Sequence, residues 1–342
     1  QIFGITGSLD GDMFLQYQYT EKKILKVFLE KNKEGLYEVK VDFSKDFNEL
    51  FEMLENRSKE IHNHPDPILE LTEREIKEFF NDKTDVVYIP AGRSMITLLS
   101  NQMNYIYSSM DDIQKRNMDY CTRSYLEKIL QMKSVFTISP VEMLNDVISM
   151  TYIKIDEERA KESISLMKQL LQGEYINKDG EERLQVSKNR YVKLNYASSG
   201  QQEVVWILNV LFYYLLNGES TYFIIEEPES HLFPNSQKLV MEFIALVCNG
   251  NGNQLFLTTH SPYILGTINN LLYADKVSKD VDESQLSRII SKNKWLNYDK
   301  VNAIFVQNGK IKSCLDEEFK SIENEVIDGV SEQINEDYDK IL

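Results

Sequence analysis

Hydrophobic and polar positions alternate with a period of two along the first part of the chain. The alternation covers Met13 to Tyr19, Ile24 to Leu29 and Leu36 to Phe43, and short polar breaks separate the three runs. Successive side chains of a strand point to opposite faces, so this pattern predicts strands, and the short breaks predict antiparallel neighbours. We therefore expect a three-stranded antiparallel meander in this region.

Two helical patterns follow, from Phe47 to Arg57 and from Thr72 to Phe80, on either side of a polar loop. The loop contains His62 and His64, whose alternation could suggest a metal site. No acidic or cysteine partner stands at ligand spacing, so ordinary exposed histidines are the stronger interpretation.

A compact strand of the buried type, Val86 to Ile89, runs into Pro90-Ala91-Gly92 and then Arg93. This position directs Arg93 toward the carboxyl edge of a sheet, where it would either contact phosphate or position the next helix. From Ser94 to Gln172 the pattern is mostly helical, which predicts a long insertion of two or three antiparallel helices between two core strands. Such an insertion would serve as an arm that recruits partners or as packing over the core.

Three short motifs with candidate chemistry follow one another within about sixty residues. Ser198-Ser199-Gly200-Gln201 opens an apolar helical run, so its free backbone N–H groups lie at a helix N-terminus, where anions bind. One strand, Tyr222 to Ile225, ends in Glu226-Glu227-Pro228, and another, Gln254 to Leu257, ends in Thr258-Thr259-His260. At that edge one carboxylate can hold Mg²⁺, the next can polarise water, and the histidine can reach a γ-phosphate.

Two hairpins flank these motifs. The first joins Arg183–Val186 to Tyr191–Leu194, and the second joins Ala303–Val306 to Lys310–Ser313 through Asn308-Gly309. Asn-Gly is a strong signal for a two-residue turn.

The composition narrows the class of protein. The chain has 342 residues, of which 42% are hydrophobic, and no segment approaches the roughly twenty apolar residues that span a bilayer. Its three cysteines, Cys121, Cys248 and Cys314, are scattered and lack ligand-spaced partners, which fits a reducing cytoplasm. The net charge of −16 opposes a broad nucleic-acid-binding surface, whereas a local basic groove stays open.

Together the motifs resemble those of ABC-type ATPases of the overcoming-lysogenization-defect (OLD) group. Relatives of this group include the ATPase subunits of the PARIS, Septu and some retron anti-phage systems, and the PARIS type is the best match. The resemblance is carried by Tyr88 to Arg93, Ser198 to Glu203, Glu226 to Pro234, Thr258 to Pro262 and Ala303 to Lys310. It implies an α/β P-loop NTPase fold of the ABC-head type, with a mixed central sheet, an N-terminal antiparallel β-meander and a helical insertion.

The resemblance also implies roles for single residues. Glu226 takes the Mg²⁺-supporting Walker B place, Glu227 the place of the catalytic base, and His260 that of the switch histidine. The residues expected to bind ATP are Ser198, Ser199, Gly200, Gln201 and Arg93, and Ser199 and Gly200 would close over the ATP of a partner. The family often has Asp where this chain has Glu226, so the longer side chain allows metal contact through water.

A phosphate-cradling Gly-x-x-x-x-Gly-Lys-Ser/Thr sequence does not occur in the chain. The nearest string, Gly4 to Ser8, lacks the lysine and the glycine spacing. Because the chain begins at Gln1 without Met and soon enters strand-like sequence, we expect the first strand and this loop to lie upstream. A degenerate head that does not hydrolyse ATP is the alternative.

Four regions are expected along the chain. They are the N-terminal part of the ATPase head (1–93), a helical insertion (94–182), the C-terminal part of the head with the signature, Walker B and histidine motifs (183–315), and an acidic helical tail (316–342).

In function, the resemblance implies a cytoplasmic ATPase that uses ATP and Mg²⁺ and forms a homo-oligomer through heads that enclose ATP between them. It would control an effector, a nuclease or a toxin supplied in trans, in response to a phage-derived trigger. The tail is too short for a TOPRIM nuclease domain and lacks its acidic residues, so the chain is not expected to cut DNA itself. The alternatives are a DNA-repair or chromosome-maintenance ATPase of the RecF, Rad50 or SMC kind, which acts on DNA directly, and a module that binds ATP without turnover.

Overall fold

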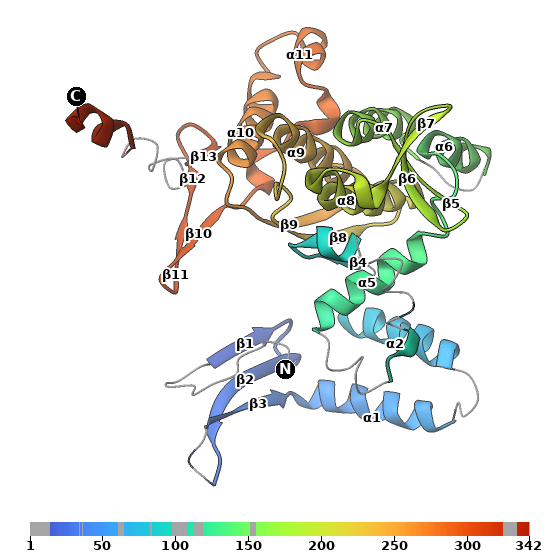
Figure 1. The fold of residues 1–342 in the computed structure, drawn as a ribbon. Coiled ribbons are helices and arrows are strands. Elements are labelled where there is room, and N and C mark those ends of the chain that lie inside the picture. Colours follow the sequence, from blue (N-terminus) through green and yellow to red (C-terminus); the bar gives the residue numbers. More distant parts are fainter. Residues whose placement is uncertain are drawn as a thin grey trace. The chain divides into compact units, whose positions relative to one another are not determined.

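The structure is a computed structural model, shown in Figure 1. It describes residues 14–33, 35, 37–60, 65–82, 84–97, 105, 108–111, 119–150, 155–323 and 334–341. His62 and His64 lie outside these residues. The chain forms two compact units, Gln1–Thr84 and Asp85–Leu342.

The smaller unit contains the expected antiparallel meander. Strands β1 (Phe14–Gln18), β2 (Ile24–Lys31) and β3 (Tyr37–Phe43) pair in the order β1-β2-β3. Helices α1 (Lys45–Glu60) and α2 (Pro65–Phe80) follow it. The prediction of three strands and two helices for this region is therefore confirmed.

Aromatic rings form much of the packing within the smaller unit. Phe47 is buried and lies against Phe43, Phe51, Phe79 and Phe80, with ring centroids 5.0 to 6.3 Å apart. Tyr19 packs edge-on against Phe80 at 5.1 Å, and its hydroxyl donates a hydrogen bond to the Phe80 carbonyl. Tyr19 therefore serves the packing of this unit.

The larger unit contains a three-stranded parallel sheet. Its strands β4 (Asp85–Ile89), β8 (Thr221–Glu226) and β9 (Gln254–Thr258) pair in the order β4-β8-β9. Alternate residues of β8 are buried, because one face of the sheet packs against helices. The described core strands pair only in parallel, whereas a mixed central sheet was expected. Because all three run in one direction, their carboxyl ends meet at one edge.

Helix α8 (Ser199–Asn217) is the centre of the hydrophobic core. Its residues from Val204 to Phe212 are all buried, as is typical of a helix covered on every side. Helices α7 (Glu157–Leu171) and α9 (Pro234–Cys248) pack against it, and α10 (Pro262–Val277) packs against α9, as Figure 1 shows. Helices α5 (Tyr120–Met132) and α6 (Pro140–Ser149) contribute buried residues to the same core. The described part of the helical insertion thus packs over the core.

A second antiparallel sheet leads into α8. Strands β5 (Glu174–Lys178), β6 (Glu181–Ser187) and β7 (Arg190–Lys193) pair in sequence order, and a short 3-10 helix, η1 (Leu194–Tyr196), follows. The β6–β7 hairpin confirms the sequence prediction. Strand β5 was not predicted, because its polar residues hide the alternation.

The C-terminal part of the larger unit is built from short elements. They are α11 (Glu283–Ile289), η2 (Lys292–Lys294), η3 (Tyr298–Lys300), β10 (Ile304–Gln307), β11 (Lys310–Ser313), β12 (Leu315–Asp316) and β13 (Ser321–Ile322). The β10–β11 hairpin turns at Asn308 and Gly309, with φ of 51° and 71°. Two consecutive positive φ values are what a type I′ turn requires, so the Asn-Gly prediction is confirmed.

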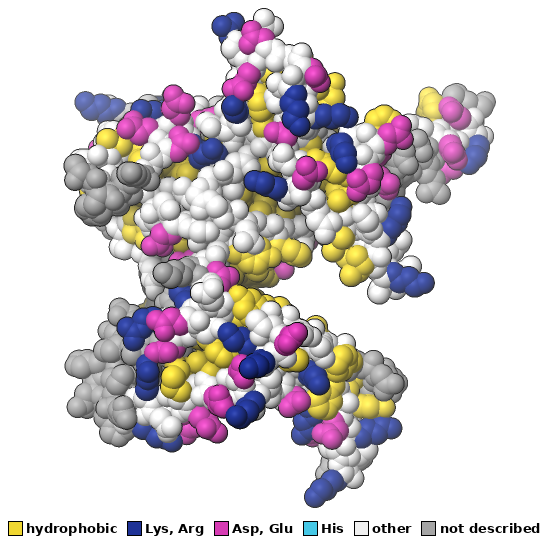
Figure 2. Space-filling view, turned by 180° about the vertical axis from the view of Figure 1, so that it is seen from behind, with side chains coloured by type: hydrophobic (Ala, Val, Ile, Leu, Met, Phe, Trp, Pro, Cys, Tyr) yellow, Lys and Arg dark blue, Asp and Glu magenta, His cyan; other side chains and the backbone are white. Residues whose placement is uncertain are grey.

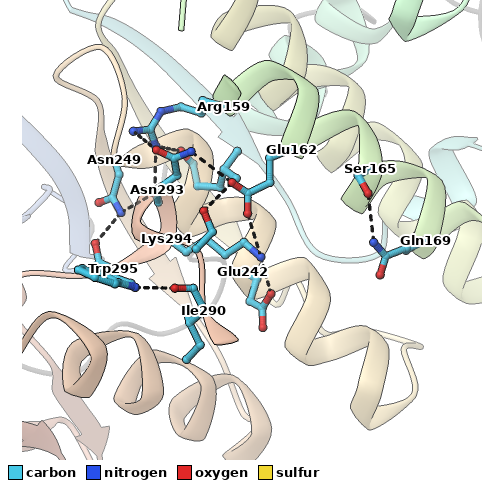
Figure 3. Close-up of polar contacts among 12 residues, drawn as sticks. Arg159, Glu162, Ser165, Gln169, Glu242, Asn249, Ile290, Asn293, Lys294 and Trp295 are labelled. Atoms are coloured by element: carbon cyan, nitrogen blue, oxygen red, sulfur yellow. Dashed lines mark hydrogen bonds and ion pairs between the residues drawn. The ribbon is translucent and has the colours of Figure 1, made fainter. Parts of the chain in front are cut away.

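A polar network ties the segment around η2 to helices α7 and α9 (Figure 3). The Lys294 ammonium lies 3.2 Å from Glu162 Oε1 and 2.9 Å from Glu242 Oε2, and its side chain is only 11% exposed. Arg159 donates to the carbonyls of Leu246 at 2.5 Å and Asn293 at 3.0 Å. Since hydrogen bonds formed by charged, buried groups are strong, this network fixes the segment to both helices.

No helix in the described part of the chain is long and apolar enough to cross a membrane.

Candidate functional site

The candidate site lies at the carboxyl edge of the parallel sheet. Glu226 ends β8 and stands opposite Thr258, the last residue of β9, while Ile89 ends β4 opposite Ile225. The residues that follow the three strands therefore share one edge, where α/β folds bind ligands. The prediction that both acidic residues and the histidine motif meet at this edge is confirmed in its geometry.

Glu227 and His260 form a pair at this edge. His260 Nε2 lies 3.3 Å from Glu227 Oε1, and the two side chains are 83% and 38% exposed. The Ser230 hydroxyl donates to Glu227 Oε2 at 3.2 Å, and the Glu227 amide donates to the Thr258 carbonyl at 3.0 Å. A carboxylate that is held in place and still reachable by solvent can orient a water molecule and accept its proton.

The backbone of Glu227 is in the left-handed region, with φ of 41°. Few residues other than glycine adopt this conformation, and those that do are concentrated at functional sites. Here the left-handed residue is the first after β8, and it turns the chain so that Ser230 comes back to the Glu227 carboxylate.

Glu226 is anchored at the other side of this edge. Its Oε2 accepts a hydrogen bond from the Ala91 amide at 3.1 Å. Burial raises the pKa of the Tyr88 hydroxyl, and the hydrogen bond between Tyr88 and Glu226 raises it further. Tyr88 therefore stays protonated and acts as a neutral neighbour of the carboxylate.

The side chains available as ligands determine how this site would hold a metal ion. Among the described residues, no group of three or more His, Cys, Asp or Glu side chains is placed to bind a metal ion. Mg²⁺ is commonly bound by one or two carboxylates together with substrate phosphates and waters rather than by a complete protein cage. Glu226 fits that arrangement as a single protein carboxylate.

Arg93 has no exposed surface, and its side chain is used entirely in holding other residues. The guanidinium donates to the carbonyls of Pro90 at 2.5 Å, Glu226 at 2.7 Å and Glu227 at 2.9 Å. Its Nε lies 3.2 Å from Glu203 Oε2, a carboxylate that also accepts the Arg93 amide at 3.0 Å. Of the two roles left open by the sequence, these contacts favour positioning over phosphate contact.

The signature segment is a capped helix start. The Ser198 hydroxyl accepts from the Gln201 amide at 3.3 Å, and the Gln201 side chain accepts from the Ser198 amide at 3.0 Å, which forms a capping box. Gln201 Nε2 also donates to the Leu171 carbonyl at 2.7 Å. Ser198 and Ser199 remain exposed, so an anion can approach the first amides of α8.

Gly200 brings the signature segment against the turn that follows the acidic pair. A Cβ atom at Gly200 would lie 2.8 Å from the His231 carbonyl oxygen and 3.1 Å from Leu232 Cδ2. Only glycine permits so close an approach. The beginning of α8 and the turn after Glu227 are therefore in direct contact within one chain.

Two acidic residues with clear structural roles were given none from the sequence. Glu203 binds the amides of Arg93 and Ser94, and Glu229 binds the residues after β9. Both stand inside the motifs that carried the resemblance. The structural role of Glu203 could have been recognised from the sequence. A charged residue directly before a long apolar helical run is expected to be buried, and a buried carboxylate needs partners.

Comparison with protein families gives a match to the AAA ATPase domain over residues 12–265. The match covers more than half of the chain and spans both compact units, so the protein belongs to this family of ATPases. Membership implies that ATP is the substrate and that its hydrolysis is the activity. A comparison with curated proteins gave no match.

Proposed function

We propose that the protein is an ATP-hydrolysing switch whose heads associate around ATP and control an effector protein in anti-phage defence. The observation that carries the proposal is the Glu227–His260 pair at the carboxyl edge of the sheet, beside the anchored Glu226. The family supplies ATP as the substrate. The wider role rests on the motif resemblance.

In this proposal Glu227 accepts a proton from the attacking water and His260 stabilises charge on the γ-phosphate. Glu226 would hold Mg²⁺, which neutralises phosphate charge when bound. Ser199 and Gly200 of a second copy would cap the same ATP, so ATP would hold the two heads together.

Charge distribution favours a protein partner over direct action on DNA. The chain carries a net charge of −16, and the face in Figure 2 has acidic and basic side chains interspersed. A DNA-clamping surface needs many lysines and arginines gathered on one face. We therefore place the nuclease or toxin activity in a separate polypeptide.

The test is Glu227→Gln in the intact protein. This change keeps the shape of the side chain and removes the base, so ATP binding should persist while turnover falls by about 10²- to 10⁴-fold. Light scattering should show that ATP-driven association becomes long-lived. The matched control is Glu219→Gln, an exposed glutamate just before the opposite end of β8, which should behave as the wild type.

Unchanged turnover in Glu227→Gln would overturn the assignment of the base. Association that does not depend on ATP would overturn the head-to-head arrangement. Tight, salt-sensitive DNA binding by the isolated protein would favour the DNA-maintenance alternative instead.

A further inference from the structure

Glu229 links the turn after the acidic pair to the residues that carry the switch histidine. Its Oε1 accepts two hydrogen bonds, from the Thr259 hydroxyl at 2.7 Å and from the His260 backbone amide at 2.7 Å. The residue is only 8% exposed. Charge-assisted hydrogen bonds in a buried setting are stronger than those between neutral groups, so this contact is a firm one.

The His260 side chain needs such support, because it is 83% exposed and little packing restrains it. Its position relative to Glu227 depends on how the two backbone segments are joined. They meet at the Glu227 amide, which donates to the Thr258 carbonyl at 3.0 Å, and again at Glu229. In the contact at Glu229, the hydrogen-bond donor is the backbone amide of His260 itself.

Thr259 extends this support toward α10. Its hydroxyl donates to Glu229 and accepts from the Ser261 amide at 3.0 Å. Ser261 in turn caps α10, since its hydroxyl accepts from the amides of Tyr263 and Ile264. The segment from residue 259 to 261 is therefore fixed between Glu229 and the first turn of a core helix.

We propose that Glu229 is a positioning residue for ATP hydrolysis, which holds the His260 imidazole next to the Glu227 carboxylate. The inference rests on the proposed function of that pair. Glu229 acts through the backbone of His260, and it would affect the rate of the chemical step more than the binding of ATP.

The two oxygens of Glu229 differ in a way that makes the idea testable. Oε2 is buried and has no hydrogen-bond partner among the residues that the structure describes, while Oε1 makes both contacts. In Glu229→Gln the amide oxygen can take the place of Oε1 and keep both bonds. In Glu229→Ala both are lost, so the two variants separate the hydrogen bonds from the negative charge of the carboxylate.

The experiment measures kcat and KM for ATP in the intact protein. We expect Glu229→Ala to lower kcat by about 100-fold with little change in KM, and Glu229→Gln to stay within a few-fold of the wild type. In a His260→Ala background, Glu229→Ala should cause no further loss, because its effect passes through the histidine. A multiplied loss in the double variant would show an independent structural role and overturn the proposal.

Amide hydrogen exchange at His260 provides a readout that does not depend on turnover. Exchange should accelerate at least tenfold in Glu229→Ala and stay near the wild-type rate in Glu229→Gln, because only the first variant loses the acceptor. Unchanged exchange in Glu229→Ala would overturn the proposal, even if the variant had lost activity. Failure of the proposed function gives a different result, namely normal turnover in His260→Ala or Glu227→Gln.

Discussion

Two glycines in helices of the larger unit should respond to alanine in opposite directions. Gly200 lies in the first turn of α8, and Gly266 lies within α10. Helix propensity alone predicts that alanine stabilises a helix interior by about 0.5–1 kcal/mol relative to glycine. The surroundings of Gly200 reverse this expectation.

The magnitude follows from the space around each Cβ position. At Gly266 nothing lies within 4 Å, so the gain in propensity should appear in full. At Gly200 the new methyl group would lie 2.8 Å from the His231 carbonyl oxygen, where ordinary contact begins at 3.4 Å, so the backbone must retreat by about 0.6 Å. Overpacking of this kind costs about 1–3 kcal/mol; from its midpoint of about 2 kcal/mol, the gain in propensity leaves a net loss of about 1–1.5 kcal/mol.

Differential scanning calorimetry of the intact protein checks the prediction. For a unit of this size, 1 kcal/mol shifts Tm by about 2–4 °C, so Gly200→Ala should lower Tm by about 2–6 °C and Gly266→Ala should raise it by about 1–4 °C. If both variants raised Tm, the close contact between Gly200 and His231 would be refuted, and with it the packing of the signature segment on the turn.

Two further predictions concern buried groups. Lys294→Ala should destabilise the larger unit by about 1–3 kcal/mol in urea unfolding, because two part-buried glutamates lose the ammonium they share. Glu242 keeps Lys238, and Glu162 keeps the hydrogen bonds from Ser291 and Asn293, so the loss stays below that of a fully unpaired buried charge. Lys161→Ala breaks only an exposed pair and should change stability by less than about 1 kcal/mol. Equal effects would contradict the role of the network. Cys248 is part-buried against the core, and this burial raises the pKa of its thiol to about 12, so at pH 8 the thiol is protonated. It should react with iodoacetamide more slowly in the native protein than in urea; equal alkylation rates by mass spectrometry would contradict its partial burial.

Several elements could be predicted because their signal is local. Alternation with a period of two identified the meander, and Asn308-Gly309 identified the turn between β10 and β11. The meeting of Glu227 with His260 was also predictable, since both follow short apolar strands and parallel strands end at one edge.

The remaining features depend on distances between segments far apart in the sequence. The partners of Arg93 are carbonyls at the ends of two strands and a carboxylate 110 residues away, and no local pattern encodes such a set. The need for glycine at position 200 arises from a carbonyl of a later turn. The packing of the insertion over the core is likewise a property of the assembled helices, whose amphipathic pattern would be the same in a free arm.

The Arg93–Glu203 pair limits how this protein can change during evolution. Loss of either member alone would leave the other as an unpaired charge with no contact to water, a change that commonly costs about 3–5 kcal/mol and can exhaust the stability of a domain. Replacement by lysine would supply the charge but only three donors, too few for the carbonyls of residues 90, 203, 226 and 227. Descendants of this sequence should therefore keep both residues or lose both together, even where the surface motifs around them diverge.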